Sequence, residues 1–147
     1  MAFRKFIIAL GLVALTGAAT LPEVIAARQS NYKQIGRANK AINDELRKSA
    51  PSMQVIQANA ATLDTLAPRL TSWFPHGSGP EAGVKTAALP VIWQRIPEFK
   101  ADAANFANAA HNLRAAAASG DVNRVRAATA ALGQTCRTCH ETFRAKD

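Results

Sequence analysis

The chain has 147 residues, the length of about one domain, with 48% hydrophobic residues and a formal net charge of +8. Alanine supplies 32 residues and aromatic residues only 6%, a composition that favours helices over strands and excludes a disordered chain. Two cysteines are too few for a disulfide-framework miniprotein. Lys and Arg are spread along the chain, which argues against nucleic-acid binding. We therefore expect an all-α fold.

Residues 1–19 have the three-part pattern of a secretory signal peptide: a basic start, an apolar run and then small residues. The apolar run, residues 6–15, is too short to span a bilayer as a helix, so a membrane anchor is the weaker alternative and no stable membrane insertion is expected. Cleavage is expected after residue 18 or 19, or alternatively after Ala26. Export would place residues 20–147 in the periplasm as one domain with a net charge of +6.

Four helical segments are expected in this domain. Apolar residues recur at steps of three, four and seven over residues 22–48, which predicts the first helix. Ser52 is the expected N-cap of the second helix, residues 53–74, which Pro68 should kink or shorten. Residues 75–89 are rich in Pro and Gly and predict a long loop.

The third helix is expected over residues 90–118, with a kink or a late start at Pro97. A turn follows, and Asp121 is the expected N-cap of the last helix, residues 122–146. Because all but one of the connections are short, the sequence predicts an antiparallel four-helix bundle.

The segment Cys136-Arg137-Thr138-Cys139-His140 matches the attachment signature of c-type haem. In such sites two thiols form thioethers with the porphyrin, and the adjoining His binds the iron as proximal ligand. Positions i, i+3 and i+4 share one helix face, so Cys136, Cys139 and His140 could all meet one macrocycle. Phe143 and Arg144 continue that face, where Phe143 could pack against the ring and Arg144 could bring charge near His140.

Other readings of the motif are weaker. A dithiol oxidoreductase usually carries its Cys-x-x-Cys after a strand, and a disulfide at this helical spacing is strained. A zinc site would need His76 or His111 from a distant segment. A sixth iron ligand would have to come from upstream, where the candidates are Met53 and the same two histidines. Each histidine is more simply a surface or packing residue.

The mature chain resembles the class II c-type cytochromes, that is, the cytochromes c′ and their low-spin relatives. The matching positions are Arg28-Gln29-Ser30 with Lys33 and Gly36, Pro90-x-Ile92-Trp93 with Phe99-Lys100, Gly120-Asp121, Arg126-Ala127-Ala128, Gly133, the haem motif, and Phe143-Arg144-x-Lys146. The resemblance implies a four-helix bundle with haem between the helices, consistent with the independent expectation. It also implies a homodimer formed through the first two helices.

The resemblance assigns the distal side of the iron to Tyr32, four residues after Arg28. Low-spin relatives have a ligating methionine there, so Tyr32 implies a five-coordinate iron open to small neutral gases such as NO and CO. Tyr32 could instead be only a core aromatic. Tyrosinate ligation is disfavoured because a phenol with a pKa near 10 resists ionisation. The resemblance also implies that Arg28 and Gln29 contact the haem propionates, although Arg28 could simply be a solvated charge.

We therefore expect an exported haem c protein, not an enzyme, that transfers electrons, binds gases, or does both. Its positive charge would favour encounter with acidic redox partner proteins, or would serve solubility alone. The alternative is a low-spin, six-coordinate electron carrier whose sixth ligand is Met53 or a histidine.

Overall fold

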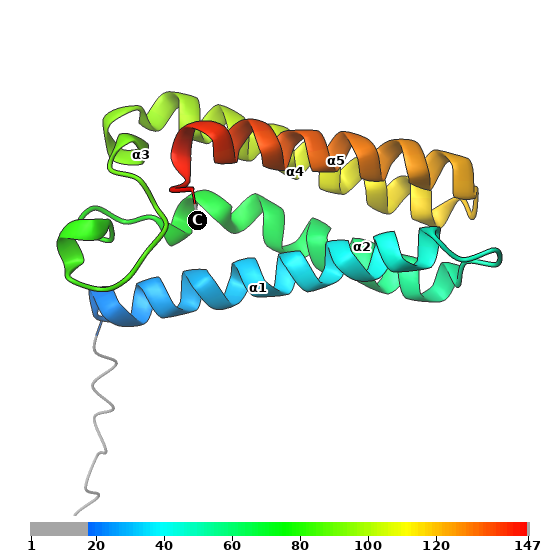
Figure 1. Ribbon diagram of the computed structural model, residues 1–147, viewed down its shortest axis with the longest axis horizontal. Helices are drawn as coiled ribbons and strands as arrows, with labels where there is room; N and C mark the ends of the chain where they lie inside the picture. Colours follow the sequence, from blue (N-terminus) through cyan, green and yellow to red (C-terminus); the bar gives the residue numbers. More distant parts are fainter. Residues whose placement is uncertain (1–17, 147) are drawn as a thin grey trace, which may run out of the picture.

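The computed structural model describes residues 18–146, in which the regular elements are all helical (Figure 1). Each of four long helices packs against two neighbours, in the order α1, α2, α4, α5 and back to α1. This is the predicted antiparallel four-helix bundle. The long helices are α1 (Leu21–Leu46), α2 (Met53–Leu66), α4 (Ile96–Ala118) and α5 (Val122–Phe143), and the short ones are η1 (Ala67–Trp73), η2 (Pro80–Ala82) and α3 (Val91–Gln94). The predicted signal peptide falls mainly on residues 1–17, outside the described part, and stays a prediction.

The helix starts follow local capping chemistry. At the start of α1, the backbone N–H and the hydroxyl of Thr20 donate to Glu23 Oε2 at 2.8 Å and 2.9 Å. Ser52 Oγ accepts from the Val55 N–H at the start of α2. Asp121 Oδ1 accepts from two backbone N–H groups of the first turn of α5. The two predicted N-caps, Ser52 and Asp121, are therefore confirmed.

Proline determines where two predicted helices are interrupted. Regular α-helix stops at Leu66 and continues as the 3-10 helix η1, because Pro68 has no N–H for the α-helical hydrogen bond. The third predicted helix divides at Arg95, whose φ of −124° and ψ of 47° separate α3 from α4. Pro97 then lies in the first turn of α4, where its missing N–H leaves no helical bond unmade. The expected effects of both prolines are confirmed.

The core explains the alanine excess of the sequence. Buried alanines alternate with larger aliphatic residues along the inward faces, so the helices can approach closely. The side chains with no exposed area include Ile25, Ile42, Ile56, Ala60, Leu63, Ala110, Leu113, Ala117, Val125 and Leu132. Within residues 18–146, no helix is both long enough and apolar enough to cross a membrane.

Candidate haem site

The Cys-x-x-Cys-His motif occupies the last two turns of α5, just before the helix ends at Phe143. Cys136 and Cys139 are free thiols, partly buried against the hydrophobic core. His140 lies one residue further on, at the surface. Because α5 is a regular helix here, the three side chains share one face, as the spacing predicted.

Burial keeps both thiols protonated at neutral pH. Burial raises the pKa of Cys136, and it raises the pKa of Cys139 to about 11, with smaller contributions from Asp102 and Cys136. Dithiol oxidoreductases instead lower the pKa of the attacking cysteine. These thiols therefore do not have the environment of a redox-active dithiol.

The zinc alternative finds no support in residues 18–146, where no three His, Cys, Asp or Glu side chains gather into a metal-binding group. His111 lies on α4 with its Nδ1 atom 3.4 Å from Asp64 Oδ1. His76 is exposed in the loop that follows η1. Neither histidine complements the two cysteines.

His140 has an environment that favours a neutral imidazole. Partial burial of the ring lowers the pKa of His140, and the nearby Arg144 guanidinium lowers it further. Neutral imidazole is the form that binds a metal ion. The predicted approach of Arg144 charge to His140 is thus present in the structure.

Tyr32 on α1 faces the motif on α5. Burial raises the pKa of Tyr32 well above its usual range, and the electrostatic influence of Cys139 and Cys136 adds to this effect while Arg28 opposes it. The Tyr32 ring packs edge-on against Trp73, with ring centroids 5.7 Å apart. The α1–α5 seam that these residues border is the most sparsely packed of the four helix seams. Tyr32 therefore stays a neutral phenol, which does not favour a tyrosinate ligand.

Three buried aromatic rings close the end of the site. Phe74 packs edge-on against Phe99 at 4.8 Å, and Phe99 packs edge-on against Phe143 at 5.4 Å. The cluster joins the end of η1, α4 and the last turn of α5. Phe74 and Trp73 are site residues that were not predicted from the sequence, although two adjacent aromatic residues directly before a Pro- and Gly-rich loop were the available signal. Contact of Phe143 with a macrocycle stays a prediction.

Arg28 is buried, with only 3% of its surface exposed, so the expectation of a solvated charge is wrong. Its guanidinium donates to the hydroxyl and the carbonyl of Ser78 at 3.0 Å and 2.9 Å, and to Thr86 Oγ1 at 2.9 Å. It also lies over the Phe74 ring, 4.5 Å from the centroid. Gln29 is exposed and its Nε2 donates to the Lys85 carbonyl at 2.9 Å. Their predicted contacts with haem propionates stay predictions.

The remaining sixth-ligand candidate, Met53, begins α2 next to the α1–α2 turn. That turn lies at the opposite end of the bundle from the last turn of α5 (Figure 1). Met53 is therefore poorly placed as a sixth ligand, whereas the loop that holds His76 lies at the same end of the bundle as the last turn of α5 (Figure 1).

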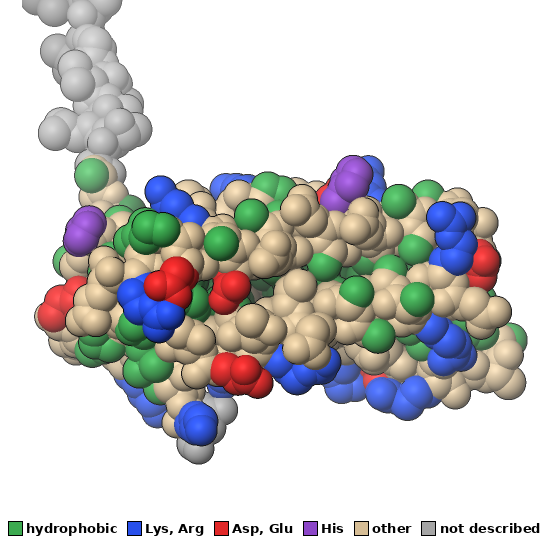
Figure 2. Space-filling view, turned by 90° about the horizontal axis from the view of Figure 1, so that it is seen from above, with side chains coloured by type: hydrophobic (Ala, Val, Ile, Leu, Met, Phe, Trp, Pro, Cys, Tyr) green, Lys and Arg blue, Asp and Glu red, His purple; other side chains and the backbone are tan. Residues whose placement is uncertain are grey.

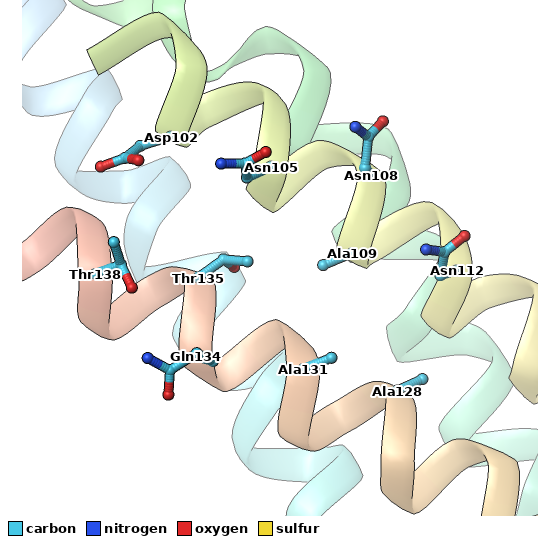
Figure 3. Close-up of a pocket in the computed structure, with 10 residues that line it drawn as sticks. All are labelled: Asp102, Asn105, Asn108, Ala109, Asn112, Ala128, Ala131, Gln134, Thr135 and Thr138. Atoms are coloured by element: carbon cyan, nitrogen blue, oxygen red, sulfur yellow. The ribbon is translucent and has the colours of Figure 1, made fainter. Parts of the chain in front are cut away.

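A groove of about 440 Å³ runs between α4 and α5 (Figure 3). Amide, hydroxyl and alanine side chains dominate its lining, and it holds no thiol or imidazole. The lining residues are Asp102, Asn105, Asn108, Ala109, Asn112, Ala128, Ala131, Gln134, Thr135 and Thr138. It is therefore not the site that the haem motif serves.

A haem c group fits the donor set of the α1–α5 seam. Two thiols and a neutral imidazole share one face of α5, and the aromatic cluster supplies the apolar surroundings that a porphyrin requires. Cys136 and Cys139 would hold the group, and His140 would bind the iron. The group would supply a redox-active iron, and the chain would supply its attachment and environment.

Comparison with known proteins agrees with this geometry. The family model described as Cytochrome C′ matches residues 23–144. The cytochrome c′ of Pararhodospirillum photometricum is 38% identical over 118 residues, which cover 80% of this chain and 92% of the relative. The crystal structure of cytochrome c′ from Thermochromatium tepidum superposes with a TM-score of 0.82 at 28% identity, covering 87% of this chain and 98% of that one.

A nitric oxide complex of a variant cytochrome c prime from Alcaligenes xylosoxidans superposes with a TM-score of 0.78 at 27% identity, covering 88% of this chain and all 100% of that one. The family match, the sequence relatives and the solved structures thus extend over nearly the whole described chain. With the motif and the bundle in place, these findings identify the family: the chain belongs to the cytochromes c′, which are haem proteins.

Proposed function

We propose that the protein is a periplasmic haem c protein with a five-coordinate iron that binds small neutral gases such as NO and CO and exchanges single electrons. The observation that carries the proposal is the position of Tyr32, whose ring packs edge-on against Trp73 and which lies within electrostatic reach of Cys136 and Cys139 on α5. A protonated phenol is a poor iron ligand, and the candidate ligand Met53 lies at the opposite end of the bundle from the motif. The nitric oxide complex described for the Alcaligenes relative supports the gas-binding part.

The periplasmic location rests on the signal-peptide pattern of residues 1–19. A homodimer is also part of the proposal, because a similar solved cytochrome c′ is described with a ligand-controlled dimer dissociation. In this chain the dimer would form through α1 and α2, so ligand binding and subunit association could be measured together.

Electron exchange would use acidic partner proteins. Residues 122–146 hold five cations and one acid, whereas residues 18–121 hold eleven cations and eight acids. Figure 2 shows Lys and Arg side chains along the lower long edge of this face and, more scattered, along the upper edge. The segment that carries the haem motif, residues 122–146, thus has a net charge of +4, which favours encounter with an anionic partner.

The absorbance spectrum of the reduced protein tests the coordination state. A broad high-spin Soret band without sharp α and β bands is expected, together with a clear change on addition of CO. A sharp α band in the native protein would contradict the five-coordinate iron. Tyr32→Met should give a low-spin spectrum, whereas the matched control Tyr32→Phe should stay high-spin; a high-spin Tyr32→Met protein would place residue 32 away from the iron.

A further inference from the structure

Residues 85–89, here called the strap, pair with the chain directly after the haem motif. The Leu89 N–H donates to the Phe143 carbonyl at 3.1 Å, and the Ala145 N–H donates to the Ala87 carbonyl at 2.8 Å. These bonds form an isolated antiparallel bridge centred on Ala88 and Arg144. The strap therefore holds the chain one turn beyond His140.

The start of the strap is held by α1. Arg28 Nη2 donates to Thr86 Oγ1 at 2.9 Å, and Gln29 Nε2 donates to the Lys85 carbonyl at 2.9 Å. Thr86 Oγ1 in turn accepts the Ala88 N–H at 3.2 Å, within the strap itself. One threonine hydroxyl thus connects the buried guanidinium to the bridge residue that pairs with the end of α5.

The same guanidinium also holds the beginning of the loop. Arg28 binds both the hydroxyl and the carbonyl of Ser78, and the Ser78 hydroxyl donates to the Pro75 carbonyl at 2.8 Å. Ser78 has no exposed surface, so these bonds lie away from water. A planar guanidinium can serve several acceptors at once in fixed directions, which a lysine ammonium cannot reproduce.

We propose that Arg28 is a positioning residue that sets the width of the haem pocket by fastening the strap between α1 and the end of α5. Tyr32 lies one turn after Arg28 on α1, and His140 lies one turn before the residues paired with the strap. The strap thus joins the two walls of the α1–α5 seam, where direct helix packing is sparsest. The position of the haem in this inference rests on the proposed function. The hydrogen bonds of Arg28 and the strap are independent of it.

The test compares Arg28→Lys and Thr86→Val with the control Arg37→Lys, an exposed arginine on the same helix. Thr86→Val is nearly isosteric and leaves Arg28 in place, so it keeps the test valid if Arg28→Lys fails to mature. In the haem-loaded protein, amide hydrogen exchange is measured at Leu89 and Ala145. Both variants should speed exchange there by about ten- to a hundred-fold, the factor expected when a charge-assisted hydrogen bond is lost.

The second readout is the rate of CO association with the reduced protein. Both variants should change this rate by at least about threefold in the same direction, whereas Arg37→Lys should leave it as in the native protein. Unchanged exchange at Leu89 and Ala145, or faster exchange with an unaltered CO rate, would overturn the proposal. If the native protein binds no CO, the proposed gas site fails, and the spin-state spectrum of the variants replaces the rate as the pocket readout.

Discussion

Phe99 should contribute more to stability than any exposed apolar residue, because its ring joins three elements around the site. Only 2% of its surface is exposed, and its ring contacts the rings of Phe74 and Phe143 edge-on at 4.8 Å and 5.4 Å. Phe99→Ala removes the ring, both aromatic contacts and the packing of α4 against the last turn of α5. Truncation of a buried Phe to Ala lowers the free energy of unfolding by about 3–5 kcal/mol. Because Phe99 also makes two edge-to-face ring contacts, the expected loss for Phe99→Ala is about 4 kcal/mol.

The assay is urea denaturation of the haem-loaded protein followed by far-UV circular dichroism. With a slope of about 2 kcal/mol per molar urea, a loss of ~4 kcal/mol lowers the midpoint by about 2 M. Val55→Ala is the matched control, because Val55 is 37% exposed on α2 and its truncation should change stability by less than about 0.5 kcal/mol. A loss below about 1 kcal/mol in Phe99→Ala would refute the packing argument.

Two further predictions concern charge. Hydrogen bonds from Lys48 and from the Ser52 backbone N–H lower the pKa of Glu45 in the folded protein. The Glu45 carboxylate therefore stabilises the fold fully above its unfolded pKa of about 4.3, and this stabilisation is lost as the pH falls through its folded pKa. Urea denaturation at several pH values measures the difference in unfolding free energy between the native protein and Glu45→Gln. This difference should be constant near pH 7 and should shrink below about pH 4. A difference that does not change with pH would contradict the prediction. The second-order rate of oxidation of the reduced protein by the anion ferricyanide should fall as ionic strength rises. The double variant Arg126→Glu with Arg137→Glu should lose most of that salt dependence. The variant Arg69→Glu, on η1, should keep it.

The sequence predicted those features that depend on local chemistry. Ser52 and Asp121 cap their helices as expected, and Pro68 and Pro97 interrupt theirs, because each effect is determined within one or two turns of the chain. The haem motif was equally accessible, since the i, i+3, i+4 spacing alone places its three side chains on one face of a helix.

Contacts between distant segments could not be predicted in the same way. Arg28 is separated from Ser78 by 50 residues and from Thr86 by 58 residues, so its burial depends on how the loop folds back onto α1. The last helix ends at Phe143, not at residue 146, because Leu89 and Ala87 pair with residues 143 and 145. Neither effect leaves a pattern in the local sequence.

Covalent attachment of haem through Cys136 and Cys139 is the central claim, and denaturing electrophoresis followed by haem-dependent peroxidase staining tests it most directly. The native protein, produced with the haem c maturation system, should give a stained band because thioether bonds survive denaturation. The double variant Cys136→Ser with Cys139→Ser should give a band of the same size without stain. A colourless native band would contradict the account, and so would a stained band from the double variant.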